Sequence, residues 1–398
     1  MNSARWLRRE LKVFSDKGGS ISRSAVCQAR KKLKPSLFTE IDEGFVNHFY
    51  ESNQVEYWKG MQMVAMDGTS LITNELIYED FLNQLTAEEL EDLKENHKHT
   101  FEEETQVHAV TLHDIINDIC LGHVVNLKSL GEREMLVRLK ELLKPNMVLT
   151  LDRGYPARWF FHLLQEIGVK FIIRMKTTHC KTTQEFFESD KSEQDVTLTL
   201  KGKDIGRLSK AGIASSRGDQ VKLRLVRVEH EGTVRIFATN LKLEKATPEE
   251  IGDLYHMRWW IEKSYYTFKT YLKLEGWRIY SQQGLMMDFA IKILLYNLSS
   301  ITCQPARKAL VIAQEKRELK KPNTQFMYRL CKVYSIESLM EELLPFVTKQ
   351  VSANIEDALK NYIFDLIRNP STVQKGRRVK RPDKHKPERA HLMNRKTA

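Results

Sequence analysis

The sequence predicts a mixed α/β fold in which an α/β core carries a β-rich insertion and is flanked by helical regions. Between residues 59 and 176, short apolar runs typical of strands alternate with amphipathic helical stretches. Residues 177–245 contain runs of alternating apolar and polar residues, separated by glycine and charged turns. Helical patterns return at residues 246–284 and continue through residues 285–370. These three observations together exclude an all-α or all-β chain.

The first part of the core, residues 59–176, is predicted to contain five strands and two helices. The run MQMVAMDGTSL indicates a strand that ends at Asp67, and TQVHAVTLHDIINDICLGHVVNL indicates a hairpin that turns at IND. A helix closed by Pro145 follows, and then the strand NMVLTL, which runs out at Asp152. A helix stopped by Gly168 leads to the last strand, VKFIIRMK. Both aspartates thus stand where an apolar strand is expected to end.

The segment 246–284 is predicted to be one helix that carries an unusual polar line. On a continuous helix, Tyr255, Arg258, Glu262 and Lys269 fall within about 60° of one another, beside the apolar stripe. That placement suits groups that face a cleft. The alternative is an ordinary amphipathic helix whose Arg258–Glu262 pair lies on the surface and contributes little.

Charge is concentrated at the two ends of the chain. Of a net charge of +11, a net of +8 lies between Lys375 and Lys396, so residues 371–398 are expected to be a basic, disordered tail. Residues 1–58 are predicted to be helical and basic, with Arg23, Arg30 and Lys31 on a helix that either contacts DNA or is an ordinary surface helix. Basic segments bind nucleic acid, and other acidic surfaces, by counterion release.

Several classes of protein are disfavoured. The five cysteines are scattered and never in CxxC spacing, which indicates neither a disulfide framework nor a zinc site. The most apolar run, FAIKILLYNL, is interrupted by Lys292, and the start of the chain lacks the apolar region of a signal peptide. We therefore expect a cytoplasmic protein.

Three carboxylates define the candidate chemistry. If Asp67, Asp152 and Glu262 are brought together, their mutual repulsion requires cations, and carboxylate oxygens favour Mg²⁺, with Mn²⁺ as a plausible substitute. Two such ions would stabilise the attacking and leaving oxygens of an in-line phosphoryl transfer. Arg258 and Lys269 would then be placed to hold flanking phosphates. Either aspartate alone would more often be a turn residue.

The motifs together resemble a known family. The spacing of Tyr255, Arg258, Glu262 and Lys269 resembles the signature of the DDE transposases of bacterial insertion-sequence family four. The motifs DGTS and LDRGYP resemble the first and second aspartate motifs of that family, and SAVCQARKKLKPSLF and NPSTVQKGRR also look like its members. The resemblance covers most of the chain.

The resemblance implies an RNase H-like core formed by residues 59–176 and 246–284, interrupted by the insertion. It also implies that Asp67, Asp152 and Glu262 bind the catalytic metals, and that Tyr255, Arg258 and Lys269 contact transposon-end DNA. Some relatives hold a flipped base with a tryptophan of the insertion, whereas this chain has no tryptophan between Met175 and Asn240.

The expected function is therefore that of a bacterial DNA transposase. It would hydrolyse a phosphodiester at the ends of its element and transfer the freed 3′-hydroxyl into double-stranded target DNA. A homodimer in the synaptic complex is expected, with the helices after residue 285 as candidates for its interface, and neither a membrane nor a small-molecule substrate is involved. The alternatives are a non-catalytic DNA-binding protein derived from a transposase, a nuclease with an RNase H fold, and an RNA-binding protein that uses only the tail.

Overall fold

The computed structural model divides into two compact units, Met1–Thr302 and Cys303–Ala398. The structure describes residues 22–52, 54–87, 90–91, 94, 106–127, 130–230, 232–274, 279–321, 326–343 and 354–374. The predicted basic tail beyond residue 374 and the first 21 residues lie outside this part of the chain. The finer domain boundaries stay predictions.

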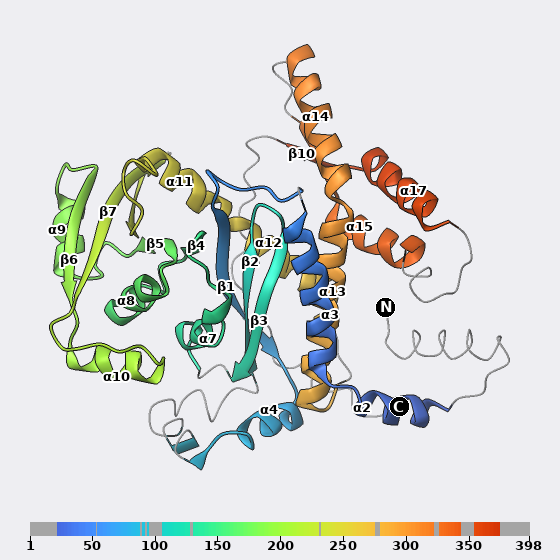
Figure 1. Cartoon of the computed structure of the whole chain (residues 1–398), viewed down its shortest axis with the longest axis horizontal. Helices are drawn as coiled ribbons and strands as arrows, with labels where there is room; N and C mark the ends of the chain where they lie inside the picture. The colour runs from blue at the N-terminus through green and yellow to red at the C-terminus, as the bar shows by residue number, and fades with distance from the viewer. Residues whose placement is uncertain are drawn as a thin grey trace. The chain divides into compact units, whose positions relative to one another are not determined.

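An eight-stranded mixed sheet organises the first unit (Figure 1), in the order β3-β2-β1-β4-β5-β8-β7-β6. The sheet and the helices around it confirm the predicted mixed α/β fold. The strands span Gln62–Ile72 (β1), Gln106–Asp114 (β2), Ile119–Leu127 (β3), Met147–Leu151 (β4), Lys170–Met175 (β5), Glu193–Thr199 (β6), Gln220–His230 (β7) and Thr233–Thr239 (β8).

Strands β1 to β5 form the half of the sheet that belongs to the predicted core. β1, β2 and β3 are antiparallel neighbours, while β4 lies parallel to β1 on its other side and β5 lies parallel to β4. The predicted hairpin is present and turns at Asp118, whose positive φ of 60° is tolerated by a short polar side chain. The strand order along the chain agrees with the prediction.

β1 differs from its prediction in one respect. The strand was expected to end at Asp67, but it continues through Gly68 to Ile72, and Asp67 pairs with Thr111 of β2. The Asp-Gly pair, which usually marks a turn, is here an interior pair of a long strand. A Cβ at Gly68 would come within 2.2 Å of His108 Nε2, so glycine leaves room for that side chain.

The insertion extends the core sheet. β8 pairs antiparallel with β5, and β6, β7 and β8 are antiparallel to one another, so the eight strands form one continuous sheet. Two helices of the insertion, α9 (Lys181–Glu188) and α10 (Gly202–Lys210), were not predicted. Both are short and polar, and their sequences resemble the charged turns around them.

Helices cover both faces of this sheet (Figure 1). One core cluster joins α7 and α8 to alternate residues of the strands, among them Met66 of β1 and Leu151 of β4. Because side chains alternate along a strand, the residues that follow, Asp67 and Asp152, belong to the opposite face. The helices of this cluster are α7 (Glu132–Arg138), η1 (Lys140–Leu142) and α8 (Arg158–Ile167), and α8 ends at Gly168 in the left-handed region. A further helix, α4 (Glu75–Leu82), follows β1.

The predicted single helix of residues 246–284 is broken into three segments. α11 (Pro248–Met257) begins with a capping box formed by Thr247 and Glu250. Arg258 interrupts the helix, α12 (Trp259–Tyr266) follows, and a π-helical turn, η2 (Thr267–Tyr271), completes it. The polar line therefore does not lie on one regular helix, although its members remain on consecutive segments.

Two long helices pack together in the first unit. α3 (Pro35–Glu51) lies against α13 (Gln282–Thr302), and α2 (Arg23–Lys31) precedes them, with Ser22 as its N-cap. α2 ends before Pro35, and Pro35 begins α3, where its missing N–H leaves no helical hydrogen bond unmade. α13 is long and apolar enough to cross a membrane, yet half of its apolar window is buried inside the protein, as in a core helix.

The second unit is mainly helical. Its helices pack around α17, and its two short strands form an antiparallel pair. The elements are α14 (Gln304–Lys320), β9 (Phe326–Arg329), α15 (Lys332–Ser338), η3 (Leu339–Leu343), α17 (Ile355–Arg368) and β10 (Ser371–Gln374).

Candidate active site

The sheet brings the two predicted aspartates to neighbouring positions. β1 and β4 pair in parallel as far as Ala65 and Thr150. Two residues further along each strand, the same register places Asp67 beside Asp152, on the face opposite the α7–α8 core. Asp152 directly follows β4, as predicted, and its carboxylate accepts a hydrogen bond from Gly154 N (2.7 Å).

Arg258 connects the third carboxylate to the first. Its guanidinium donates from Nη1 to Asp67 Oδ2 (3.2 Å) and from Nη2 to Glu262 Oε1 (2.7 Å). The Arg258 side chain is only 13% exposed, so this is no surface pair. Its guanidinium also stands 5.7 Å from the centre of the Tyr255 ring. The break at Arg258 thus lies at the centre of the site.

Negative charge accumulates around Asp67. Burial, together with the charges of Glu132 and Asp152, raises the pKa of the Asp67 carboxyl to about 6, against the lowering effect of Arg258. Glu132 lies next to Gly68, where its carboxylate contacts His108 Nε2 (2.9 Å) and accepts a hydrogen bond from Tyr155. An excess of carboxylate charge of this kind favours a bound cation.

The donor chemistry fits a hard divalent cation, because the three predicted ligands are carboxylates. In the part of the chain that the structure describes, no three His, Cys, Asp or Glu side chains are grouped closely enough to hold a metal ion. The guanidinium of Arg258, bonded to both Asp67 and Glu262, supplies the positive charge between them instead.

Tyr265 is a residue of the site that sequence reasoning missed. Its hydroxyl donates to Asp67 O (2.6 Å) and accepts from Thr111 N (3.0 Å), so it bridges β1 and β2 where Asp67 stands. It follows Glu262 by three positions on α12, and it therefore fixes the distance between that helix and the strand. Within an aromatic run such as WWIEKSYYTF, nothing in the sequence distinguishes it from a packing residue.

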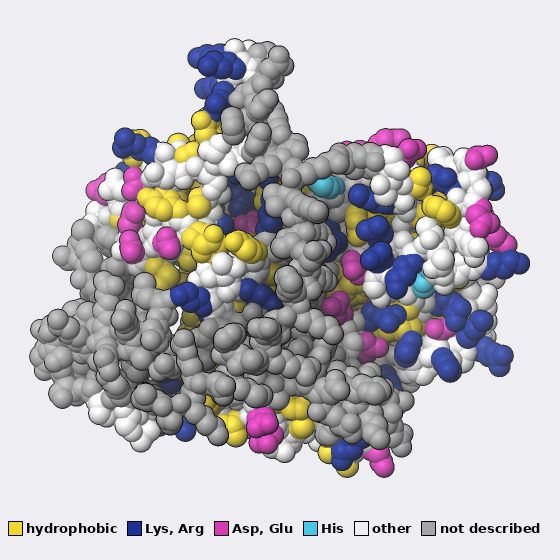
Figure 2. Space-filling view, turned by 180° about the vertical axis from the view of Figure 1, so that it is seen from behind, with side chains coloured by type: hydrophobic (Ala, Val, Ile, Leu, Met, Phe, Trp, Pro, Cys, Tyr) yellow, Lys and Arg dark blue, Asp and Glu magenta, His cyan; other side chains and the backbone are white. Residues whose placement is uncertain are grey.

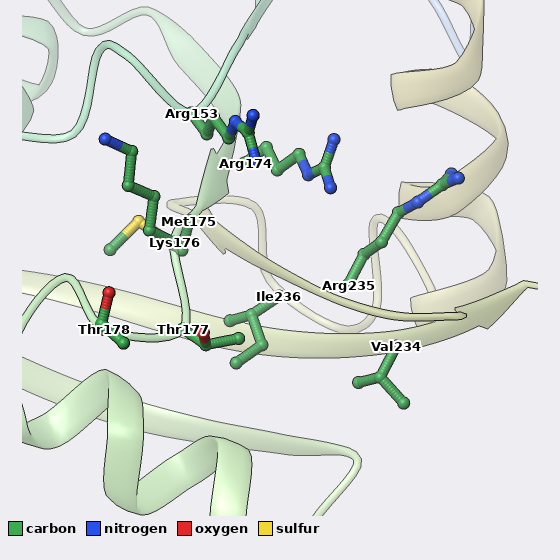
Figure 3. Close-up of a pocket in the computed structure, with 9 residues that line it drawn as sticks. All are labelled: Arg153, Arg174, Met175, Lys176, Thr177, Thr178, Val234, Arg235 and Ile236. Atoms are coloured by element: carbon green, nitrogen blue, oxygen red, sulfur yellow. The ribbon is translucent and has the colours of Figure 1, made fainter. Parts of the chain in front are cut away.

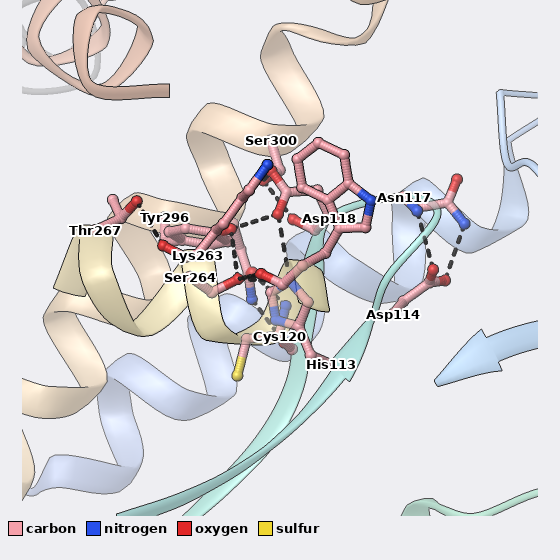
Figure 4. Close-up of polar contacts among 12 residues, drawn as sticks. His113, Asp114, Asn117, Asp118, Cys120, Lys263, Ser264, Thr267, Tyr296 and Ser300 are labelled. Atoms are coloured by element: carbon pink, nitrogen blue, oxygen red, sulfur yellow. Dashed lines mark hydrogen bonds and ion pairs between the residues drawn. The ribbon is translucent and has the colours of Figure 1, made fainter. Parts of the chain in front are cut away.

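A second anchor holds α12 from the other side (Figure 4). Ser264 Oγ lies 3.2 Å from His113 Nε2 and 3.0 Å from Tyr296 Oη, and the Tyr296 hydroxyl donates to Asp118 at the turn of the β2–β3 hairpin. The figure shows these side chains converging from α12, α13 and the hairpin. The helix that carries Glu262 is thus tied to both neighbours by buried polar groups, which fixes its position.

The remaining predicted residues are placed as follows. Tyr255 is almost buried and packs against Phe237, with ring centres 4.7 Å apart. Lys269 Nζ donates to the backbone oxygen of Ser70 (2.8 Å), so it too reaches β1.

On the N-terminal helix α2, Arg30 and Lys31 are exposed. Arg23 begins the same helix, but its side chain lies outside the described part of the chain. The structure does not bring these three near the carboxylates by any described contact, and their role stays a prediction.

Two known proteins are similar to parts of this chain. A curated relative, the transposase for insertion sequence element IS231E of Bacillus thuringiensis subsp. finitimus, is 31% identical over 86 residues, which is 22% of this chain but only 18% of that protein. A cryo-EM structure of the piggyBac transposase synaptic complex with hairpin DNA aligns with a TM-score of 0.37 and 11% identity, covering 77% of this chain and 57% of that one. That likeness is too distant to support a statement about the site.

The family comparison covers the core and the insertion. The model of the transposase DDE domain family matches residues 58–298, which is more than half of the chain and includes Asp67, Asp152 and Glu262. The chain therefore belongs to the transposase DDE domain family.

Proposed function

We propose that this protein is the transposase of a bacterial insertion sequence of family four, which cuts double-stranded DNA at the ends of its element and joins the freed 3′-hydroxyl to target DNA. The observation that carries the proposal is the convergence of Asp67, Arg258 and Glu262 on one face of the sheet, with Asp152 in the adjoining register. Membership of the DDE domain family supports it.

Asp67, Asp152 and Glu262 are the proposed ligands of two Mg²⁺ ions, with Mn²⁺ as a substitute. When bound, such ions activate the attacking oxygen and stabilise the leaving oxygen of an in-line displacement. The chain itself supplies the position of each carboxylate, since Tyr265 and Ser264 fix α12 against the sheet. Arg258 offsets carboxylate charge through its two hydrogen bonds.

We further propose that Tyr255, Arg258 and Lys269 face transposon-end DNA, and that Arg23, Arg30 and Lys31 contact it further from the cut. Arginine suits this role because its planar guanidinium binds phosphate through two hydrogen bonds. A homodimer that brings two ends together is the proposed assembly. A cytoplasmic, nucleoid-associated location follows from a DNA substrate in a bacterium.

The test is cleavage and joining of a duplex that carries the inverted end sequence, taken from the DNA that flanks the gene. With Mg²⁺ present, Asp152→Asn and Glu262→Gln are each expected to reduce cleavage roughly a thousandfold, because each removes several kcal/mol of transition-state stabilisation. The matched control is Glu249→Gln, an exposed acid on α11 with the same change of charge.

Two results would contradict the proposal. Undiminished cleavage by both carboxylate variants would show that the site is not catalytic, as in a DNA-binding protein derived from a transposase. Cleavage by the wild-type protein without joining of a pre-cleaved end to target DNA would identify a nuclease instead.

A further inference from the structure

A cavity of about 280 Å³ opens where the insertion meets the core (Figure 3). It is lined by the turn after β4, the end of β5 with the residues that follow, and the start of β8. Four of its nine lining residues are cations, namely Arg153, Arg174, Lys176 and Arg235. We call these four residues the basic pocket.

The charged groups of the basic pocket do not pair with other side chains in the described part of the chain. Among the residues that the structure describes, no hydrogen bond or ion pair joins their charged groups to another side chain, and Arg235 Nε is buried without a partner. Two other arginines of the insertion differ because their guanidinium groups have protein partners: Arg224 bonds Glu193 (2.6 Å), and Arg227 donates to backbone oxygens that include Phe186 O (2.9 Å). Each of these two, like Arg235, also has one buried nitrogen without a partner. Like charges held together without anions repel one another, so the basic pocket favours an anionic ligand.

The basic pocket adjoins the carboxylate site. Arg153 is the residue directly after Asp152, and Arg174 lies near enough to Tyr255 for its charge to oppose the burial that raises the pKa of that phenol. Figure 3 shows the guanidinium groups of Arg174 and Arg235 pointing away from their strands and toward the neighbouring helix. On the face seen in Figure 2, Lys and Arg side chains also gather on the side of the molecule that carries the insertion strands.

The side chains that line the cavity indicate whether a base or a phosphate of DNA could bind there. Pockets that hold an extruded base stack it between aromatic or apolar side chains, whereas none of the nine lining residues here is aromatic. Arginine and lysine around a small cavity match phosphate oxygens.

We propose that the basic pocket binds backbone phosphates of one DNA strand as that strand leaves the carboxylate site, and does not hold a flipped base. This inference rests on the proposed function and specifies how its substrate is held. It also assigns the insertion a task, because Arg235 of β8 belongs to the insertion while Arg153 and Arg174 belong to the core.

The test measures binding of a short single-stranded oligonucleotide by fluorescence anisotropy in EDTA, over a range of salt concentrations. For Arg174→Gln/Arg235→Gln we expect affinity to fall about tenfold, and the slope of log K against log salt to become shallower by about 0.7 for each phosphate that the variant no longer binds. Replacing single phosphates of the oligonucleotide by neutral methylphosphonates should weaken binding by the wild-type protein but not by this variant.

A control variant and a second variant of the basic pocket are measured in the same way. Lys203→Gln/Lys210→Gln removes the same charge from exposed positions on α10 and should leave the slope unchanged. Arg153→Gln/Lys176→Gln changes two exposed members of the basic pocket, so it tests the pocket even if the first variant fails to fold. If both pocket variants bind with the wild-type slope, or are weakened no more than the α10 control, the proposal is wrong.

This test is separate from the proposed function. Because binding is measured without metal, Glu262→Gln should retain the wild-type slope although it does not cleave. If the carboxylate variants cleave normally while the pocket variants bind fewer phosphates, the catalytic assignment fails and the phosphate site stands.

Discussion

Two regions of the first unit each contain an aspartate that is shielded from solvent, Asp42 fully and Asp67 partly, and the two acids have different roles. Asp42 on α3 lies against α13, where Asn297 Nδ2 donates to both of its carboxylate oxygens (3.1 and 2.8 Å). Asp67 on β1 lies at the centre of the sheet, bonded to Arg258. Burial raises the pKa of both carboxyls, to about 7 for Asp42 and about 6 for Asp67.

The difference lies in the neighbours of each acid. Asn297 also bonds the backbone of Cys120, so the contact with Asp42 ties α3 and α13 to the β2–β3 hairpin. The charges of two more acids, Glu132 and Asp152, act on Asp67. Arg258 joins Asp67 to a further acid, Glu262. A raised pKa alone therefore does not identify a site, whereas a group of acids that shares one cation does.

The largest expected difference between the two aspartates is the effect on DNA cleavage when each is neutralised in turn. Asp67→Asn is expected to lower DNA cleavage roughly a thousandfold, because it removes a proposed metal ligand. Asp42→Asn should cleave as well as the wild-type protein. Cleavage assays with equal amounts of folded protein, checked by circular dichroism, compare the two. Equal losses would mean that both acids act only through stability.

Arg258 is the next test, because it separates charge from geometry. Arg258→Gln leaves Asp67 and Glu262 without their shared cation, and we expect cleavage to fall roughly a hundredfold, with the loss of about 3 kcal/mol that one charge-assisted interaction provides. Arg258→Lys keeps the charge but cannot bond both carboxylates through a planar fork, so it should recover only part of the activity. Full activity of the lysine variant would show that the bridge is unimportant.

A smaller effect is expected at Tyr265. Tyr265→Phe removes the hydroxyl that joins Asp67 O to Thr111 N, at a cost of about 1–3 kcal/mol in the free energy of unfolding. We expect cleavage to fall several-fold and the Mg²⁺ concentration for half-maximal rate to rise, because Asp67 and Glu262 are less well positioned. The control is Tyr266→Phe, which alters the next and exposed tyrosine. A change in stability with no change in metal requirement would reduce Tyr265 to a packing residue.

The last prediction concerns stability alone. The folded state binds the Asp42 proton more tightly than the unfolded chain, so this group makes the protein less stable as pH rises from about 4 to about 7. Asp42→Asn should therefore gain stability over the wild-type protein in that interval, by at most about 4 kcal/mol above pH 7, and should match it near pH 4. Denaturant unfolding at several pH values measures this gain, and a pH-independent difference would contradict the assignment.

The sequence predicted the core well because its strands are apolar and its helices are clearly punctuated. Gly168 ends α8 in the left-handed conformation that only glycine adopts readily, and the Thr247–Glu250 box begins α11. The placement of Asp67 beside Asp152 follows from parallel pairing, which the strand and helix order already implied. Their metal-binding role remains a prediction.

The failures have physical causes. No local pattern could show that β1 continues past Asp-Gly, because the continuation depends on pairing with β2, which is distant in sequence. The break at Arg258 carries no glycine or proline, and it coincides with the long-range contact to Asp67. The bridging hydroxyl of Tyr265 and the basic pocket are likewise tertiary features, made by elements that meet only in the folded chain.

The continuity of the sheet at β5 and β8 also has a consequence for how this chain tolerates damage. β8 covers the side of β5 that would otherwise be an open edge, and Phe237 of β8 packs against Tyr255. A deletion that removed the insertion would expose the backbone of a buried strand, and exposed edges of this kind template aggregation. We therefore expect variants that lack residues 177–245 to disappear from the soluble fraction, so that loss of this segment removes the protein itself and leaves no folded, inactive form.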